Sequence, residues 1–142
     1  MFINNVTSGG AIPLLEKTLA FAEARNRVLA TNIANITTPG YRAKQLDLAG
    51  FQKALAQASE QRDRGGSFEL PTTNQFRQDD VGMLKVTPTE EPAENVLFQD
   101  GTNARIESQM SQLAENTLMN QVSTELLKGY YDGMGKAIRG RA

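Results

Sequence analysis

The chain has 142 residues, a length suited to one domain, but its 39% hydrophobic and 6% aromatic content is lean for a compact core. Lysine and arginine number 15 against 16 aspartates and glutamates, so no excess positive charge is available to bind nucleic acid or anionic lipid. Histidine and cysteine are absent, and these are common general bases, metal ligands and nucleophiles. We therefore expect no enzyme: no catalytic residues, metal, cofactor, small-molecule substrate or nucleic-acid partner.

The first twelve residues predict a disordered amino-terminal arm, because they begin with a polar, glycine-ended stretch. They carry neither the cationic segment nor the apolar run of a secretory signal, and no part of the chain is apolar enough to cross a bilayer. If the protein works outside the cytoplasm, we expect it to be exported without a cleaved signal peptide.

Residues Pro13 to Asn35 predict an amphipathic helix. Proline is favoured in a first helical turn, and the apolar residues behind it recur at alternating three- and four-residue spacings. This row forms a seam that we expect to face another helix. It consists of Leu15, Leu19, Ala22, Leu29, Ile33 and Ile36.

The helix runs into the turn sequence NIANITTPGY, residues 32–41. Asn35 tolerates the left-handed conformation that closes many helices, and Thr38 favours extended backbone because proline follows it. Pro39 and Gly40 suit the two central positions of a type II turn, where proline presets the first φ and glycine accepts the positive second φ. The chain leaves the helix in one defined direction, which by itself fits either a structural corner or a joint used in assembly.

A shorter helix is predicted from Leu46 to Glu60, which completes an amino-terminal helical region over residues 13–60. Residues 61–99 are rich in glycine, proline and polar residues, and they predict a flexible, partly extended insertion. Short extended runs are expected at Ser67–Leu70, Met83–Thr87 and Asn95–Gln99. The adjacent carboxylates of this insertion are read as solvated loop residues rather than as a cation site; they are Asp79, Asp80, Glu90 and Glu91.

The carboxy-terminal region, residues 100–142, predicts a long helix from Ile106 to Ile138. Its regular four-three row is taken as the seam towards the amino-terminal helix, and its apolar members are Ile106, Met110, Leu113, Leu127, Tyr131, Met134 and Ile138. The same row contains Thr117, Asn120 and Thr124, which either set the register of a coiled-coil-like pair or face solvent if the seam lies elsewhere.

A second apolar row recurs every four residues along the same helix, and only one row can face the amino-terminal helix. It consists of Ala114, Leu118, Val122, Leu126 and Tyr130. The predicted fold is therefore mainly α, with long amino- and carboxy-terminal helices paired in a coiled-coil-like manner around a flexible middle segment.

The turn sequence resembles the amino-terminal signature of the bacterial flagellar axial (rod and hook) protein family, in which N-[IL]-A-N is followed shortly by T-P-G-[YF]. The matching residues are Asn32, Ile33, Ala34, Asn35, Thr38, Pro39, Gly40 and Tyr41. The flanks Arg25–Ala30 and Arg42–Leu48 are most similar to the proximal rod subunits of that family. Asp100–Asn103 and the following Leu113–Leu118 resemble its carboxy-terminal element, although Ala104–Ile106 and Asn120-Gln121 depart from the usual residues.

The resemblance implies a structural subunit of the flagellar basal-body rod, which polymerises through its terminal helices into the axial tube while the middle segment stays peripheral. It also implies as partners further copies of the chain, other rod subunits, proteins of the membrane-ring junction and the type III export apparatus. The implied location is the periplasm-spanning rod. The alternatives are another short rod subunit of the same family and a non-flagellar secreted helical interaction module.

Overall fold

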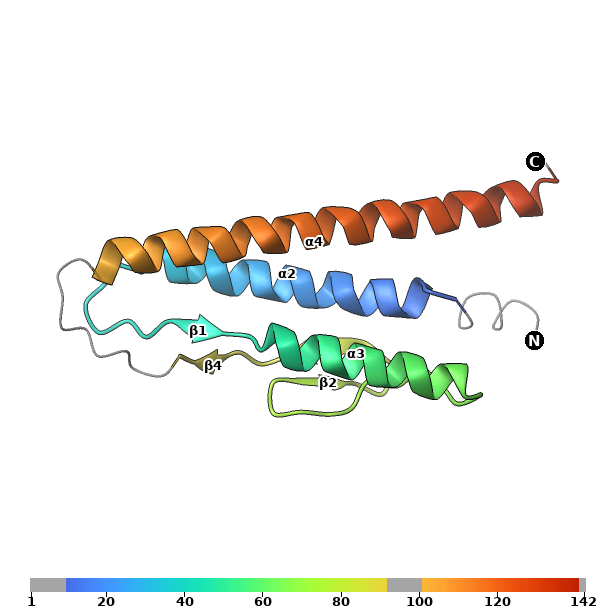
Figure 1. Cartoon of the computed structure of the whole chain (residues 1–142), viewed down its shortest axis with the longest axis horizontal. Helices are drawn as coiled ribbons and strands as arrows, with labels where there is room; N and C mark the ends of the chain where they lie inside the picture. The colour runs from blue at the N-terminus through green and yellow to red at the C-terminus, as the bar shows by residue number, and fades with distance from the viewer. Residues whose placement is uncertain (1–9, 92–100, 141–142) are drawn as a thin grey trace.

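The computed structural model describes residues 10–91 and 101–140 as three helices joined by short strands (Figure 1). The helices are α2 (Ile12–Ala34), α3 (Leu48–Asp63) and α4 (Gly101–Ile138), and the strands are β1 (Lys44–Gln45), β2 (Phe76–Gln78), β3 (Leu84–Val86) and β4 (Thr89–Glu90). Each predicted helix is present, with ends within a few residues of the expected ones, except that α4 begins five residues earlier than Ile106. Of the predicted amino-terminal arm, residues 1–9 lie outside the described residues, whereas Ile12 is buried at the start of α2.

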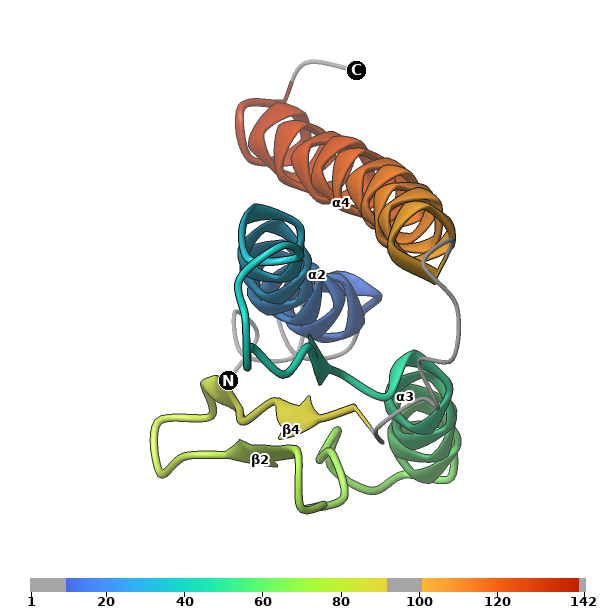
Figure 2. The ribbon, with the colours of Figure 1, turned by 90° about the vertical axis from the view of Figure 1, so that its left-hand side faces the viewer.

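The elements form three layers, with α4 on one side of α2 and with α3 and the strands on the other (Figure 2). The two long helices run antiparallel, because the end of α2 contacts the first turns of α4 and Glu16, near the start of α2, contacts Tyr131. The 38 residues of α4 extend about 57 Å against about 35 Å for the 23 residues of α2. This confirms the mainly helical fold with paired terminal helices.

The hydrophobic core lies between α2, α3 and the strands rather than between the two long helices. The rings of Phe21 and Phe51 stack with centroids 3.9 Å apart, and Phe76 meets Phe51 edge-on at 5.6 Å. Around them pack the buried side chains of Leu46, Ala54, Leu55, Ala58 and Leu70. Aromatic rings carry the largest buried areas of any side chains, so this cluster is the main source of stability in the chain.

The middle segment is extended in part, as predicted, but residues 67–91 form a packed layer rather than a loose insertion. Leu70 and Phe76 are 5% and 3% exposed. Strand β3 falls within the predicted run Met83–Thr87, whereas Ser67–Leu70 joins no ladder and Asn95–Gln99 lies outside the described residues. The sequence did not predict strand β2, because three residues are too few to show an alternation of apolar and polar side chains. The strand is defined by its pairing with β3.

Two antiparallel pairings organise this layer. In the first, β1 pairs with β4 and brings Lys44 opposite Glu90. In the second, Asp79 organises the turn of the β2–β3 hairpin, since its Oδ1 accepts hydrogen bonds from the Met83 and Val81 amides at 2.8 and 3.1 Å. The Met83 bond is the main reason that the pKa of Asp79 lies below its usual value. Asp79 is thus a structural turn residue, while Asp80 is exposed.

Candidate functional site

The turn that follows α2 has the geometry expected of Pro39 and Gly40. Gly40 has φ +76°, and the Tyr41 amide donates to the Thr38 carbonyl at 3.2 Å, as in a type II turn. The prediction for Asn35 is wrong: its φ is −107°, outside the left-handed region. The helix closes instead through a bifurcated contact, in which both the amide and the Nδ2 of Asn35 donate to the Thr31 carbonyl, at 3.1 and 2.9 Å.

Asn32, the first residue of the turn sequence, is 2% exposed and uses its whole hydrogen-bonding capacity. Its Oδ1 accepts from the Lys44 amide at 2.9 Å and from the Tyr41 hydroxyl at 3.0 Å. Its Nδ2 donates to the Lys44 carbonyl at 2.7 Å and to Oε1 of Gln109 at 3.1 Å. The Asn32 side chain therefore holds Tyr41 and Lys44 against α2, and it also binds the first turns of α4 through Gln109.

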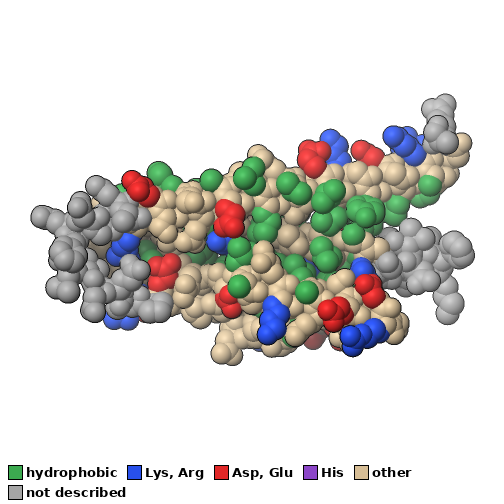
Figure 3. All heavy atoms as spheres, viewed as in Figure 1, with side chains coloured by type: hydrophobic (Ala, Val, Ile, Leu, Met, Phe, Trp, Pro, Cys, Tyr) green, Lys and Arg blue, Asp and Glu red, His purple; other side chains and the backbone are tan. Residues whose placement is uncertain are grey.

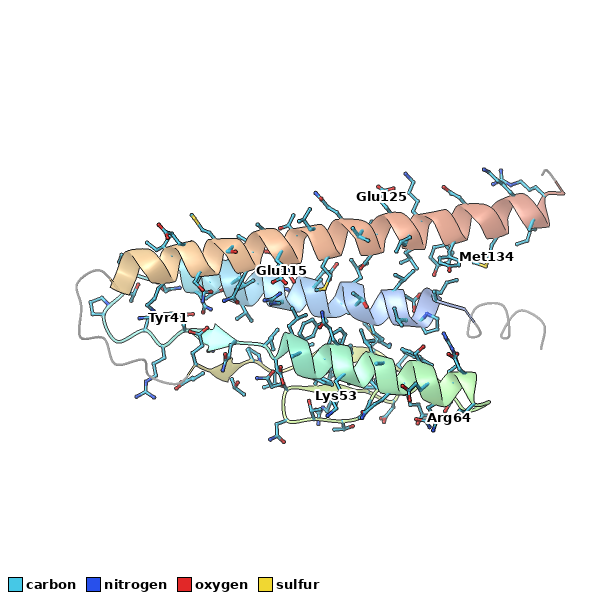
Figure 4. All side chains as sticks on the ribbon, in the orientation of Figure 1. Tyr41, Lys53, Arg64, Glu115, Glu125 and Met134 are labelled. Carbon is cyan, nitrogen blue, oxygen red and sulfur yellow. The ribbon has the colours of Figure 1, made fainter. Side chains whose placement is uncertain are left out.

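Gln109 extends this connection to Glu91, the residue that follows β4. Its Nε2 donates to Oε1 of Glu91 at 3.4 Å, while the Glu91 amide donates to the Ala43 carbonyl at 2.8 Å. Tyr41, at the turn, lies beside this junction (Figure 4). The direction in which the chain leaves α2 is thus set by contacts from four elements, and the junction does not depend on the turn alone.

The other residues of the turn sequence lie nearer the surface. Ala34, Thr38, Pro39 and Gly40 are exposed, and Ile33, Asn35 and Tyr41 are half-buried. The structure therefore separates the sequence into one buried anchor, Asn32, and an exposed corner that remains free to contact other molecules.

The face of α4 that contacts α2 carries polar residues at seven-residue spacing. Gln109, Asn116 and Ser123 are 7%, 0% and 4% exposed. The same face carries half-buried residues of the predicted seam, which are Ile106, Leu113, Asn120, Leu127 and Met134. On α2, Leu15 and Leu29 are buried and Leu19 and Ile33 half-buried. A seven-residue repeat of polar residues is a recognisable seam signal in the sequence, but apolar periodicity alone does not reveal it.

The predicted seam of α4 is wrong at three apolar positions: Met110, Tyr131 and Ile138 are 55%, 47% and 87% exposed. Thr117 and Thr124 are also exposed, and their hydroxyls donate to the carbonyls of their own helix at i−4 instead of setting the register. Buried polar residues occupy the centre of the contact, so the apolar row is only half-buried at its edge, and Tyr131 reaches α2 through its hydroxyl, which donates to Glu16.

The polar seam is held by a small number of specific contacts. Nδ2 of Asn116 donates to the Ala22 carbonyl at 2.8 Å. The guanidinium of Arg25, 6% exposed, lies 3.5 Å from a carboxylate oxygen of Glu115, which Figure 4 shows at the border between α4 and α2. Among the described residues, Nη1 of Arg25 and Oδ1 of Asn116 have no hydrogen-bond partner, so this seam is less stable than an apolar seam of the same area.

The second apolar row of α4 is largely exposed to solvent. Its large members are between 46% and 62% exposed, and together with Met110 of the first row they make up what we call the α4 stripe: Met110, Leu118, Val122, Leu126 and Tyr130. Figure 3 shows hydrophobic side chains along α4, with charged side chains towards its outer edge. A continuous exposed apolar row of this length is typical of an interaction surface.

Within residues 10–91 and 101–140, no three histidine, cysteine, aspartate or glutamate side chains are grouped closely enough to hold a metal ion. Nor does any described helix contain an apolar stretch long enough to cross a membrane.

Curated flagellar proteins are similar to the chain over nearly its full length. The flagellar basal body rod protein FlgB of Escherichia coli K12 is 31% identical over 127 residues, which cover 87% of this chain and 89% of that protein. The chain belongs to the FlgB family. FlgB of Bacillus subtilis is 28% identical over 131 residues, and FlgB of Cereibacter sphaeroides 31% over 122, covering 95% and 88% of those proteins. No family model and no solved structure matches the chain.

Membership of the FlgB family confirms the resemblance carried by the turn sequence. It makes the chain a structural protein of the flagellar basal-body rod, and hence a protein of motility. Three residues that carry the resemblance make contacts described above. Asn32 anchors the outgoing chain, and Glu115 and Asn116 contact α2.

Proposed function

We propose that the chain is a subunit of the proximal rod, which polymerises through α2 and α4 into the wall of the axial tube. The observation that carries this proposal is the α4 stripe. A helix pair that needed only to fold would turn its largest apolar side chains inward, whereas α4 presents polar residues to α2 and leaves Leu118, Val122 and Leu126 exposed.

The partners of this function are further copies of the chain, neighbouring rod subunits and the proteins of the membrane-ring junction. Delivery is by the flagellar type III export apparatus, and the working location is the periplasm-spanning rod. Family membership supports each of these, and the similarity to several FlgB proteins favours the proximal rod over another short rod subunit. A structural role needs no reacting group, which agrees with a chain that has no histidine or cysteine.

The test is complementation of a strain that lacks the gene. Val122→Glu places a charge in the α4 stripe without disturbing the fold, because Val122 is 58% exposed. We expect this variant to be exported but to leave cells non-motile and without rods, since an unpaired charge buried at a contact costs several kcal/mol. Gln121→Glu, the same charge one position away on an exposed residue, is the control and should swim.

Normal swimming and rod assembly by Val122→Glu would contradict the proposal. Circular dichroism of both purified variants checks that neither substitution has changed the helix content.

A further inference from the structure

A groove runs between α2 and the β2–β3 hairpin, on the side of α2 away from α4. It encloses about 430 Å³ and is lined mainly by apolar side chains, among them Ala20, Ala24, Val28, Met83, Leu84 and Val86. On α2 its wall is a row of small or short residues four apart, which leaves room for larger side chains beside that helix. It is an apolar surface that nothing in the described chain fills.

The ends and edges of this groove are polar. Near one end, Nζ of Lys17 donates to the Gly82 carbonyl and ties the hairpin tip to α2. Along the outer edge lie Glu23 and Arg27, both exposed and without an ion-pair partner among the described residues. Their charges follow the order negative then positive along the chain.

The α4 stripe matches this groove in spacing and in size. Val122, Leu126 and Tyr130 are four residues apart, like the small row Ala20, Ala24 and Val28. Rows with four-residue spacing on two helices interdigitate in the commonest mode of helix packing. Large side chains on one helix and small ones on the other let the two helices approach closely, with Tyr130 opposite Ala20, Leu126 opposite Ala24 and Val122 opposite Val28.

A charge beside the stripe selects one orientation. Glu125, three residues after Val122, is exposed next to the stripe, and no ion pair occupies it in the part of the chain that the structure describes. Figure 4 shows Glu125 on the outer side of α4. An antiparallel arrangement with Leu126 opposite Ala24 brings Glu125 beside Arg27, whereas in the parallel arrangement Glu125 is level with Glu23, a like charge. The same antiparallel register pairs the apolar residues named above.

The antiparallel orientation is also the one that a polar filament requires. Inside one molecule α2 and α4 already run antiparallel, as the contacts of Asn32 with Gln109 and of Glu16 with Tyr131 show. When two copies point the same way, α4 of one is therefore antiparallel to α2 of the next. No inversion of either copy is needed.

We infer that the groove between α2 and the hairpin receives the α4 stripe of a second copy of this chain. The inference rests on the proposed rod function and names the surface that the stripe binds. Because stripe and groove are different surfaces, the contact is heterologous: each copy can use both at once, and association continues in one direction as a filament instead of closing as a two-fold dimer.

Disulfide cross-linking tests this pairing cleanly, because the chain has no cysteine of its own. Ala24→Cys and Leu126→Cys are combined in one chain, which is expressed in the null strain, and isolated basal bodies are oxidised. We expect a ladder of dimers, trimers and longer species, since each subunit forms two bonds. Ala24→Cys with Leu118→Cys is the control. It moves one thiol about 12 Å along the same stripe, out of reach of a disulfide, and should not cross-link.

A second pair, Val28→Cys with Val122→Cys, repeats the test with the smallest change of side-chain volume. Failure of both pairs to cross-link, dimers without longer species, or equal cross-linking by the control would each overturn the inference. If cross-linking fails while Val122→Glu still abolishes rods, the rod function stands and only the groove is excluded. If Val122→Glu swims normally, it is the rod function that fails.

Charge reversal gives an independent measurement of the register. Arg27→Glu and Glu125→Arg should each lower the cross-linking yield by about fivefold, the effect expected when an exposed ion pair is lost. Combining the two substitutions restores the pair with its signs exchanged and should recover the yield. If the double variant is no better than the single ones, the proposed antiparallel register is wrong.

Discussion

A single buried asparagine does more than any other residue to shape this molecule. Asn32 accepts and donates four hydrogen bonds that join α2 to the turn, to Lys44 and to α4. Each partner group is left without its bond if the side chain is shortened, and a buried polar group without a partner costs about 1–3 kcal/mol. Its place in the turn sequence therefore has a direct physical meaning, because no apolar residue can replace it.

We expect Asn32→Ala to lower the free energy of unfolding by about 2–4 kcal/mol, as measured by urea denaturation followed by circular dichroism. Asn26→Ala is the matched control: Asn26 is exposed on the same helix, and its loss should change stability by about 0.5 kcal/mol or less. Equal stability of the two variants would show that the junction is not held through Asn32.

Gly40 is the second residue on which the joint depends, because its φ of +76° lies in the left-handed region. We expect Gly40→Val to block rod assembly without preventing export, since a β-branched residue at that φ costs about 1–3 kcal/mol and drives the turn into another shape. Export and swimming are scored separately in the complemented null strain. Gly40→Asn, which tolerates positive φ, should retain assembly. A swimming Gly40→Val strain would mean that the type II turn is dispensable.

The β2–β3 hairpin contributes more to the fold than the sequence predicts. The sequence predicts that residues 61–99 form a flexible insertion, which would lie at the periphery. In the structure, Phe76 of β2 contacts Phe51 edge-on and Leu70 packs into the same cluster. The hairpin is therefore part of the core that supports α2 and α3, and it also forms one wall of the groove beside α2.

Accordingly, Phe76→Ala should destabilise the chain by about 3–5 kcal/mol, the usual cost of removing a buried aromatic ring. Thermal and urea unfolding measure this effect. Arg77→Ala in the same strand removes an exposed side chain and should be nearly neutral. If Phe76→Ala unfolds like the parent chain, the hairpin contributes little to stability and the earlier view of a peripheral segment is the better one.

At the scale of the whole molecule, the chain exposes far more surface than a self-sufficient domain. Its accessible area is 10,026 Å², whereas a compact monomer of 15.5 kDa exposes about 7,200 Å². The long α4 contributes to this area, since residues beyond Tyr131 extend past the start of α2 (Figure 1). This exposure agrees with the proposal that neighbouring subunits cover part of α4.

We expect the purified chain at micromolar concentration to contain less helix than the structure, and to gain helix on assembly. The carboxy-terminal turns of α4 should be least stable, because Gly129, Gly133 and Gly135 each cost about 1 kcal/mol relative to alanine. Hydrogen exchange should show rapid exchange over residues 129–138 and slow exchange in α2 and α3. A sharp cooperative melt with full helix content, or strong protection of residues 129–138, would contradict this expectation.

The features that the sequence alone determined are local ones. The bounds of α2 follow from apolar periodicity, the turn follows from the fixed φ of Pro39 and the freedom of Gly40, and the family follows from the turn sequence itself. Each depends on residues close together along the chain, where spacing and backbone preference act directly.

Only the tertiary structure decided which face of α4 meets α2 and what fills the core. The seam contains Gln109, Asn116 and Ser123, whose burial depends on distant partners such as Asn32 and the Ala22 carbonyl. A search for apolar rows cannot find a contact made by satisfied polar groups, and it assigned to that contact side chains that α4 leaves exposed. The burial of Phe76 likewise depends on a ring 25 positions away in the chain, a pairing on which local periodicity carries no information.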